Sequence, residues 1–424
     1  MEKLLPADDL DLTGLVRPGD RIICGQGTSE PTALTSRLVA QRHAIGPLDI
    51  FLGPTYSDTF APERTDGIRF TSYGGIGRTA SLAKAGRLNV VPCSYSALSK
   101  AFASGGERAD VVLLQLAPAR GGGPYSLSLA NDYVALAARH ARTVIAEVNP
   151  WAPWTYGAEL PADIVIHAYV EAQNPPVQLA RPRTGEVEVR IATYVADLIP
   201  ERATLQLGVG AIPEAVVEGL RHHRGLGIHS GLIGDGVVDL IEWGVVTNAH
   251  KSIDRGITVS GVLFGTDRLN RHAADNPQLC VCPPEHTHGR DVLSQLNNFI
   301  ALNSAIEVDL TGQVNAETVD GVYVGAVGGQ PDFMRAANTV DGGRAIIALP
   351  STAKGGSISR IVPQVTTVTT PRSDVDVIVT EWGVAELRGC TLRERARRMI
   401  AIAAPQCRET LERAAHAQLR GLDD

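Results

Sequence analysis

Short apolar runs alternate along the chain with longer stretches in which apolar residues recur at helical spacing. The clearest apolar runs are residues 48–52, 111–116, 143–148, 259–264 and 375–380. Runs that are apolar at almost every position are typical of strands buried on both faces, as in parallel sheets covered by helices. The pattern predicts an α/β protein built from open, mainly parallel sheets.

One pattern occurs twice, once in each half of the chain. Residues 22–27 (Ile-Ile-Cys-Gly-Gln-Gly) and 205–210 (Leu-Gln-Leu-Gly-Val-Gly) are each followed by a proline, Pro31 or Pro213, and then by apolar residues at helical spacing. Both copies predict a strand, a tight Gly-x-Gly turn and an amphipathic helix that begins near the proline. We therefore expect two related α/β domains.

A polar, proline-rich stretch at 174–185 lies between the two copies. Such stretches are typical of domain boundaries. We place the N-terminal domain at 1–185 and the C-terminal domain, which contains most of the motifs below, at 186–424.

Composition excludes several classes of partner. The 424 residues have a net charge of -7, and no run of basic residues interleaved with aromatics is present. A nucleic-acid partner is therefore not expected. The N-terminus lacks the basic start and apolar core of a signal peptide, and no apolar stretch reaches the ~18 residues of a membrane helix. We expect a cytoplasmic enzyme that does not contact a membrane.

The cysteines are scattered rather than spaced as a disulfide framework, so reduced thiols are expected. They are Cys24, Cys93, Cys280, Cys282, Cys390 and Cys407. Cys280 and Cys282 are two residues apart in an apolar run, so both side chains lie on one face of the predicted strand. Without a second cysteine pair, packing in the core is favoured over a metal site. Residues 285–289 add two histidines and a glutamate but no further ligand, so no metal is expected.

Several motifs together resemble the acetyl-CoA hydrolase and class I CoA-transferase family. They are Gly-Val-Gly-Ala-Ile-Pro at 208–213, Gly-Ala-Val-Gly-Gly-Gln-Pro-Asp-Phe at 325–333, and the glycine-rich stretch 350–363 with its Ser-Arg-Ile-Val-Pro end. The resemblance spans nearly the whole chain and is strongest from Gln206 to Gly389. It implies two open α/β domains of the class I CoA-transferase type, a CoA-thioester substrate and a homodimer.

The resemblance also points to a missing side chain. The family places its covalent catalytic glutamate in a segment of the form Ile-His-Thr-Glu-x-x-x-Asp-Gly. Here His229, Asp235 and Gly236 match that form, and the glutamate falls on Gly231. Glycine cannot accept an acyl group, and loss of a covalent nucleophile costs several powers of ten in rate. The family's route through a glutamyl-CoA intermediate is therefore closed, unless another residue replaces the glutamate.

His229 is the first candidate for a general base. If residues 226–231 form a strand, His229 and Gly231 share a face, and an imidazole is suited to proton transfer near neutral pH. A scaffold role for His229 stays open, because the histidine also belongs to the ordinary family motif. Replacement nucleophiles are less favoured: Asp235, Asp239, Glu242, Ser230 and Cys24.

Binding residues follow from the same resemblance. In relatives, the Gly-Gly-Gln segment lies against the acyl thioester, where backbone amides and the glutamine, here Gln330, can stabilise an oxyanion by about 3 kcal/mol per donor. The phosphates of coenzyme A need cations or helix N-termini, and open α/β sheets bind ligands at the ends of parallel strands. The expected CoA-binding residues are Gly208, Gly210, Gly328, Gly329, Lys354 and Arg360.

These observations favour an enzyme that passes the acyl group of an acyl-CoA to a non-carboxylate acceptor or to water, without a glutamyl-CoA intermediate. Its partners would be acyl-CoA and a small-molecule acceptor, with coenzyme A as part of the substrate and a homo-oligomer as the assembly. Two alternatives stay open. One is a CoA-transferase between carboxylates that uses another residue, and the other is a non-catalytic acyl-CoA-binding protein.

Overall fold

The computed structural model describes residues 4–419, which form two compact units. The N-terminal unit consists of Met1–Ala180, Ile257–Gly289 and Asp320–Gly328, and the rest of the chain forms the C-terminal unit. The first break, after Ala180, lies close to the boundary expected at residue 185. Because two later segments pack with the N-terminal unit, the compact units are interleaved, whereas the predicted domains are continuous.

The N-terminal unit is built on a seven-stranded sheet in the order β4-β3-β2-β1-β5-β6-β7. Every registered strand pair in this sheet is parallel. Its strands are β1 (Arg21–Cys24), β2 (Leu48–Phe51), β3 (Ile68–Ser72), β4 (Leu88–Val90), β5 (Val111–Leu116), β6 (Thr143–Val148) and β7 (Ala168–Glu171). Its helices are α1 (Thr32–Ile45), α2 (Thr79–Lys84), α3 (Tyr95–Ala103) and α4 (Tyr133–Ala138).

The segments that return to this unit add a second, smaller parallel pair. This pair joins β10 (Thr258–Leu263) to β11 (Leu279–Val281) and is accompanied by α8 (Asp267–Ala273) and α9 (Pro284–Thr287). The short strand β16 (Val322–Tyr323) completes the unit. Backbone hydrogen bonds from Leu263 to the Leu129 carbonyl (2.8 Å) and from Leu179 to the Gly265 carbonyl (3.0 Å) tie the returning segment to the N-terminal part.

The C-terminal unit has its own sheet, in which β9-β8-β12-β17-β21-β22 are neighbours in that order. These strands are β8 (Thr204–Leu207), β9 (Gly227–Ile233), β12 (Phe299–Ser304), β17 (Arg344–Ala348), β21 (Val377–Thr380) and β22 (Gly383–Glu386). All of these pairs are parallel except β21 with β22.

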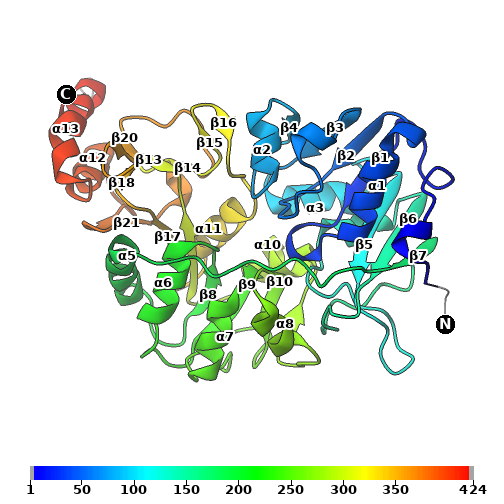
Figure 1. Ribbon diagram of the computed structural model, residues 1–424. Coiled ribbons are helices and arrows are strands. Elements are labelled where there is room, and N and C mark those ends of the chain that lie inside the picture. The colour runs from blue at the N-terminus through cyan, green and yellow to red at the C-terminus, as the bar shows by residue number, and fades with distance from the viewer. Residues whose placement is uncertain (1–3, 420–424) are drawn as a thin grey trace. The chain divides into compact units, whose positions relative to one another are not determined.

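The helices of the C-terminal unit cover this sheet. They are α5 (Glu186–Asp197), α6 (Ala211–Gly219), α7 (Asp235–Glu242), α10 (Arg290–Leu293), α11 (Gln330–Thr339), α12 (Leu392–Ala401) and α13 (Pro405–Leu419). Short strands are β13 (Glu307–Asp309), β14 (Val314–Asn315), β15 (Thr318–Val319), β18 (Thr352–Ala353), β19 (Ile358–Ser359) and β20 (Ile361–Val362). α11 packs on β12 and β17, and α5 packs on α6 (Figure 1).

The repeat seen in the sequence is a repeat of topology. In the N-terminal unit, β1 leads through α1 to β2 on one side, whereas its neighbour β5 leads through α4 to β6 on the other side. In the C-terminal unit, β8 leads through α6 to β9, and its neighbour β12 leads through α11 to β17. Where the connections that follow two neighbouring parallel strands leave in opposite directions, a crevice forms at the carboxyl ends of the strands. Open α/β sheets bind ligands at such a point.

Each unit has a hydrophobic core on its sheet. In the C-terminal unit, the core side chains come mainly from β12, β17, β21, α11 and α12. In the N-terminal unit, they come mainly from β1, β2, β5 and α1. Among the described residues, no helix has both the length and the apolar character that crossing a bilayer requires. The α/β class and the parallel sheets predicted from the sequence are confirmed.

Candidate active site

Strand β9 presents His229 and Gly231 on one face and Ser230 on the other, because successive side chains of a strand alternate. The Ser230 hydroxyl lies 3.1 Å from the Leu207 carbonyl and 2.7 Å from the Leu232 carbonyl. A hydroxyl has one proton to donate, and here backbone carbonyls accept it. Ser230 is therefore held as part of the scaffold and is not placed as a nucleophile.

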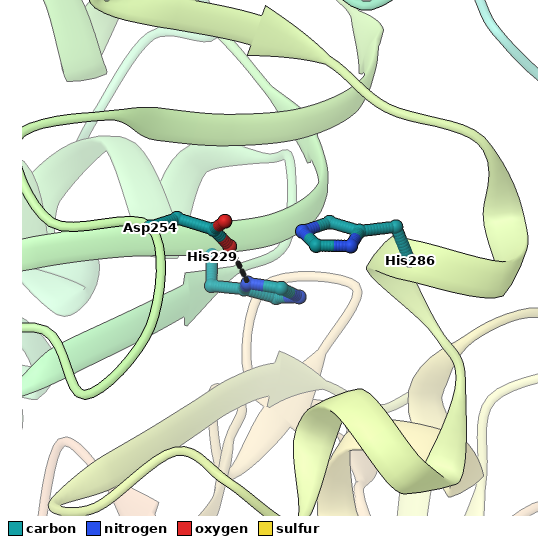
Figure 2. Close-up of side chains that lie close together, drawn as sticks. All are labelled: His229, Asp254 and His286. Carbon is teal, nitrogen blue, oxygen red and sulfur yellow. Dashed lines mark ion pairs between the residues drawn. The ribbon is translucent and has the colours of Figure 1, made fainter.

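His229 is fully buried, with 0% of its side chain exposed, and a carboxylate lies beside it. Nδ1 of His229 is 4.0 Å from Oδ2 of Asp254, and both residues belong to the C-terminal unit (Figure 2). His286, also labelled in Figure 2, comes from α9 of the N-terminal unit. A carboxylate at this distance stabilises the protonated form of an imidazole.

The loop after α7 fixes Asp254 next to β9. The Asn248 side chain accepts a hydrogen bond from the Ile228 backbone N–H (2.8 Å), and the Lys251 ammonium donates to the Ile228 carbonyl (2.9 Å). Asn248 and Asp254 have φ angles of 56° and 51°, in the left-handed region that Asn and Asp tolerate better than most residues. Both backbone groups of the residue before His229 are thus held by this loop.

Sequence analysis did not identify Asp254, because no motif links a loop aspartate to a histidine on the preceding strand. The signal that could have found it is the cluster of Asn, Lys and Asp in 248–254, where Asn248 and Lys251 are buried. Lys251 is only 1% exposed, and a lysine is rarely so buried without partners.

The turn Gly208-Val209-Gly210 lies at the same edge of the sheet as Gly231. Strands β8 and β9 pair in parallel, so their carboxyl ends meet. The Gly208 N–H donates to the Leu302 carbonyl (3.1 Å), and Gly210 has a φ of 134°, which a side chain would strain. The structure therefore places this turn at the carboxyl end of β8, at the same edge of the sheet as Gly231.

The Gly-Gly-Gln loop is divided between the two units. Gly328 belongs to the N-terminal unit, where its carbonyl accepts a hydrogen bond from the Tyr95 N–H (2.9 Å) and its φ is 53°. Gly329 caps α11, and Gln330 is the first residue of that helix in the C-terminal unit. The side-chain nitrogen of Gln330 is buried, and no group among residues 4–419 accepts a hydrogen bond from it. It is a donor available to a bound ligand.

Lys354 and Arg360 follow β17 in the C-terminal unit. Lys354 is exposed at the tip of the β18–β19 hairpin, where its φ of 48° begins a run of left-handed residues. Arg360 is partly buried, and this burial lowers the pKa of its guanidinium. Neither cationic group forms a hydrogen bond or an ion pair with any described residue. Both are therefore available to an anion.

The predicted replacement nucleophiles are less well placed. Asp239 forms an ion pair with Arg181, which also binds Glu214. Asp235 is buried at the first residue of α7, and Glu242 is the last residue of that helix. Cys24 lies in the N-terminal unit on β1, where burial raises the pKa of its thiol far above the ordinary value. A thiol that does not ionise is a poor nucleophile.

The N-terminal unit has a buried polar cluster that sequence reasoning missed. Gln26 donates to the Tyr95 hydroxyl (3.0 Å) and to Asp132 (2.7 Å), and it accepts from the Tyr73 hydroxyl (2.8 Å). Burial raises the pKa of Asp132 to about 6. These side chains come from four places in the sequence and meet only where β1 ends, so no local pattern could have joined them.

A second buried carboxylate caps α1. Glu147, on β6, accepts hydrogen bonds from the backbone N–H groups of Ala33 (2.8 Å) and Leu34 (3.2 Å). These hydrogen bonds lower the pKa of Glu147, but burial raises it by more, to about 7. Glu147 thus supports the fold at this edge of the N-terminal sheet.

Comparisons with known proteins agree on the kind of protein. The model of the acetyl-CoA hydrolase/transferase C-terminal domain matches residues 265–415. The 4-hydroxybutyrate coenzyme A transferase of Clostridium kluyveri is 37% identical over 417 residues, which are 97% of this chain and 96% of that protein. The succinyl-CoA:cyclohexane-1-carboxylate CoA transferase of Geobacter metallireducens is 34% identical, over 97% of this chain and 95% of its own.

A solved structure shares the fold over the same extent. RipA from Yersinia pestis matches with a TM-score of 0.92 at 32% identity, and the match covers 98% of this chain and 97% of that chain. A match of this length includes both sheets and the loops that hold the residues described above.

Proposed function

Because the chain belongs to the acetyl-CoA hydrolase and CoA-transferase family, we propose that it passes the acyl group of a CoA thioester directly to an acceptor that is not a carboxylate, or to water. The family resemblance inferred from the sequence is confirmed, and the chain is a CoA-thioester transferase or hydrolase. The alignment of Gly231 with the family's glutamate, and the direct route that follows from it, are parts of the proposal.

One observation supports the proposal most strongly: Gly231 lies on the same face of β9 as His229, two residues away. Without a side chain, Gly231 offers no carboxylate to take the acyl group. In the proposal, an acceptor occupies the space that a glutamate side chain would fill, next to a histidine that removes its proton.

In the proposed reaction, His229 removes a proton from the acceptor's N–H or O–H group as the acceptor attacks the thioester carbonyl. The side-chain nitrogen of Gln330 donates to the oxyanion, and one such donor contributes about 3 kcal/mol. When the carbon–sulfur bond breaks, the CoA thiolate takes the proton back from His229. The products are the acylated acceptor and free CoA, and Asp254 stabilises the imidazolium that forms between the two steps.

The phosphates of coenzyme A would be bound by cationic and backbone groups at the ends of the strands. The proposal assigns Lys354 and Arg360 to them, because neither cation has a partner among the described residues. At Gly208 and Gly210, no side chain keeps a phosphate from approaching the backbone of the turn closely. The cytoplasmic location and the homodimer stay predictions.

A second candidate is exchange of CoA between carboxylates, as the names of the two relatives above describe for those proteins. It would need a carboxylate other than residue 231. Asp235 is the carboxylate nearest to Gly231 in the chain, four residues after it at the buried start of α7.

The test incubates purified protein with a set of acyl-CoA substrates alone, with carboxylates, and with amines and alcohols, and identifies the products by mass. The proposal predicts that CoA release requires an amine or alcohol, or occurs with water alone. Exchange that requires a carboxylate would support the second candidate, and binding without turnover would indicate a non-catalytic protein.

Two variants then separate a catalytic histidine from a structural one. His229→Asn is expected to lower kcat by about 10²-fold to about 10⁴-fold, the usual contribution of a general base. Ser230→Ala, on the opposite face of the same strand, is the matched control and should keep kcat close to that of the wild type. Equal losses of kcat in both variants would assign His229 to the scaffold.

A further inference from the structure

Two cysteines that have no part in the proposed reaction lie side by side in the N-terminal unit. Cys280 is in β11, and Cys282 is the first residue after that strand. Their side chains are on the same side. Their Sγ atoms are 2.8 Å apart, which is closer than two non-bonded sulfur atoms normally approach. The two side chains differ in exposure: Cys280 is partly exposed, whereas Cys282 is buried.

The surrounding backbone holds this pair in place. The N–H of Val281, between the two cysteines, donates to the Tyr156 carbonyl (2.8 Å), and the Asn131 side chain donates to the Val281 carbonyl (3.3 Å). Gly157, with a φ of 80°, lies against the Cys280 sulfur, and a Cβ at this position would collide with it. The fold thus leaves space for this sulfur and fixes the strand that carries it.

We propose that Cys280 and Cys282 form a reversible dithiol–disulfide site, which is oxidised by low-molecular-weight disulfides such as that of glutathione. The contact between the two sulfur atoms makes the second step intramolecular, so it competes well with loss of the first adduct. The sequence predicts the shared strand face correctly. Core packing alone, however, does not account for the partial exposure of Cys280.

The reaction balances as two thiol–disulfide exchanges. The Cys280 thiolate attacks the small disulfide RSSR, which forms a mixed disulfide at Cys280 and releases one RS⁻. The Cys282 thiolate then attacks the Cys280 sulfur and releases the second RS⁻. The protein loses two protons and two electrons, and RSSR is reduced to two RSH. Cys280 reacts first because it is the more exposed of the two.

Closing the bond must distort the strand. A disulfide needs Cβ atoms about 3.5–4.5 Å apart, whereas an extended strand rises by about 6.5 Å over two residues. Oxidation would therefore shorten β11 and strain the hydrogen bond from the Cys282 N–H to the Ser260 carbonyl (2.7 Å). Strained disulfides are easily reduced, so oxidation of this site should be reversible.

The test equilibrates the full-length protein with oxidised and reduced glutathione at a series of ratios, with a chelator present throughout. Remaining thiols are alkylated, and the cysteine peptides are identified by mass. The proposal predicts that labelling of Cys280 and Cys282 falls together, with loss of two hydrogens from one peptide. Cys390 and Cys407, which are also partly exposed, are the internal control and should stay labelled.

Two variants make the order of steps testable. Cys282→Ser should stop at a glutathione adduct on Cys280, and Cys280→Ser should leave Cys282 unmodified at the same ratio. The proposal is overturned if the wild type stops at the mixed disulfide, or if Cys280 and Cys282 stay labelled at ratios that modify Cys390. It is also overturned if Cys280→Ser leaves Cys282 as readily modified as Cys280 is in the wild type.

Discussion

Replacing Asp254 by Asn removes the negative charge next to His229 and keeps the size of the side chain. The amide has the same shape as the carboxyl group, and Asn tolerates the left-handed backbone at this position, where φ is 51°. The loop that holds β9 through Asn248 and Lys251 should therefore persist. Any change in rate then reports on the interaction between the carboxylate and the imidazole.

The expected magnitude follows from the distance of 4.0 Å between Nδ1 of His229 and Oδ2 of Asp254. Unit charges this far apart interact by about 4 kcal/mol at an effective dielectric constant of about 20, and by about 1 kcal/mol in bulk water. His229 is 0% exposed and Asp254 is 24% exposed, so the loss should lie between these limits. This range corresponds to a fall in kcat of about 5-fold to about 800-fold.

The Michaelis constant should change little, because His229 becomes charged only as the reaction proceeds. The assay measures CoA release with the acyl-CoA and acceptor that give the highest wild-type turnover. Asp254→Glu, which keeps the charge, should retain more of kcat than Asp254→Asn. Asp374→Asn is the matched control, since Asp374 forms an ion pair with Arg335 (2.9 Å) on another part of the C-terminal unit. An unchanged kcat in Asp254→Asn, or a change confined to the Michaelis constant, would refute this reasoning.

Three further predictions concern binding and stability. Arg360→Ala should raise the Michaelis constant for acyl-CoA about tenfold or more and leave kcat unchanged in steady-state assays, because a charge-assisted hydrogen bond contributes about 1.5–3 kcal/mol. Gly328→Ala should lower the free energy of unfolding by about 1–2 kcal/mol in urea titrations, because a Cβ at a φ of 53° is strained, although no atom lies within 4 Å of it. Glu147 has a pKa of about 7 in the folded protein against an ordinary value of 4.5, so the folded state holds its proton more tightly and loses stability as pH rises between these values. Between about pH 5 and about pH 8, the unfolding free energy of the wild type should therefore fall by about 2 kcal/mol more than that of Glu147→Gln. An equal fall in both proteins would contradict the assignment.

Local patterns predicted the geometry that depends on a single strand. Alternation along residues 226–231 places His229 and Gly231 on one face, and β9 runs from Gly227 to Ile233 with that alternation. The same rule placed Cys280 and Cys282 together. Each of these predictions needs only the period of two that every strand has.

The sequence did not reveal features that depend on contacts between distant segments. Asp254 approaches His229 only because a loop of left-handed residues folds back on β9, and the Gln26 cluster forms only where several elements meet. The segments 257–289 and 320–328 join the N-terminal unit through contacts of the same kind. A boundary drawn at residue 185 cannot register that 257–289 pairs with the segment around Leu129. The division into continuous domains at 1–185 and 186–424 stays a prediction.

The mass of the intact protein under single-turnover conditions tests most directly whether the acyl group is transferred without a covalent enzyme intermediate. Wild-type protein and Gly231→Glu are mixed with a slight excess of acyl-CoA, quenched at short times and weighed with and without the acceptor. For direct transfer, we expect that the wild type carries no acyl or CoA adduct while product forms, and that Gly231→Glu loses direct transfer because its side chain occupies the acceptor's place. An acyl or CoA adduct on an aspartate or glutamate of the wild type, formed as fast as product, would contradict it.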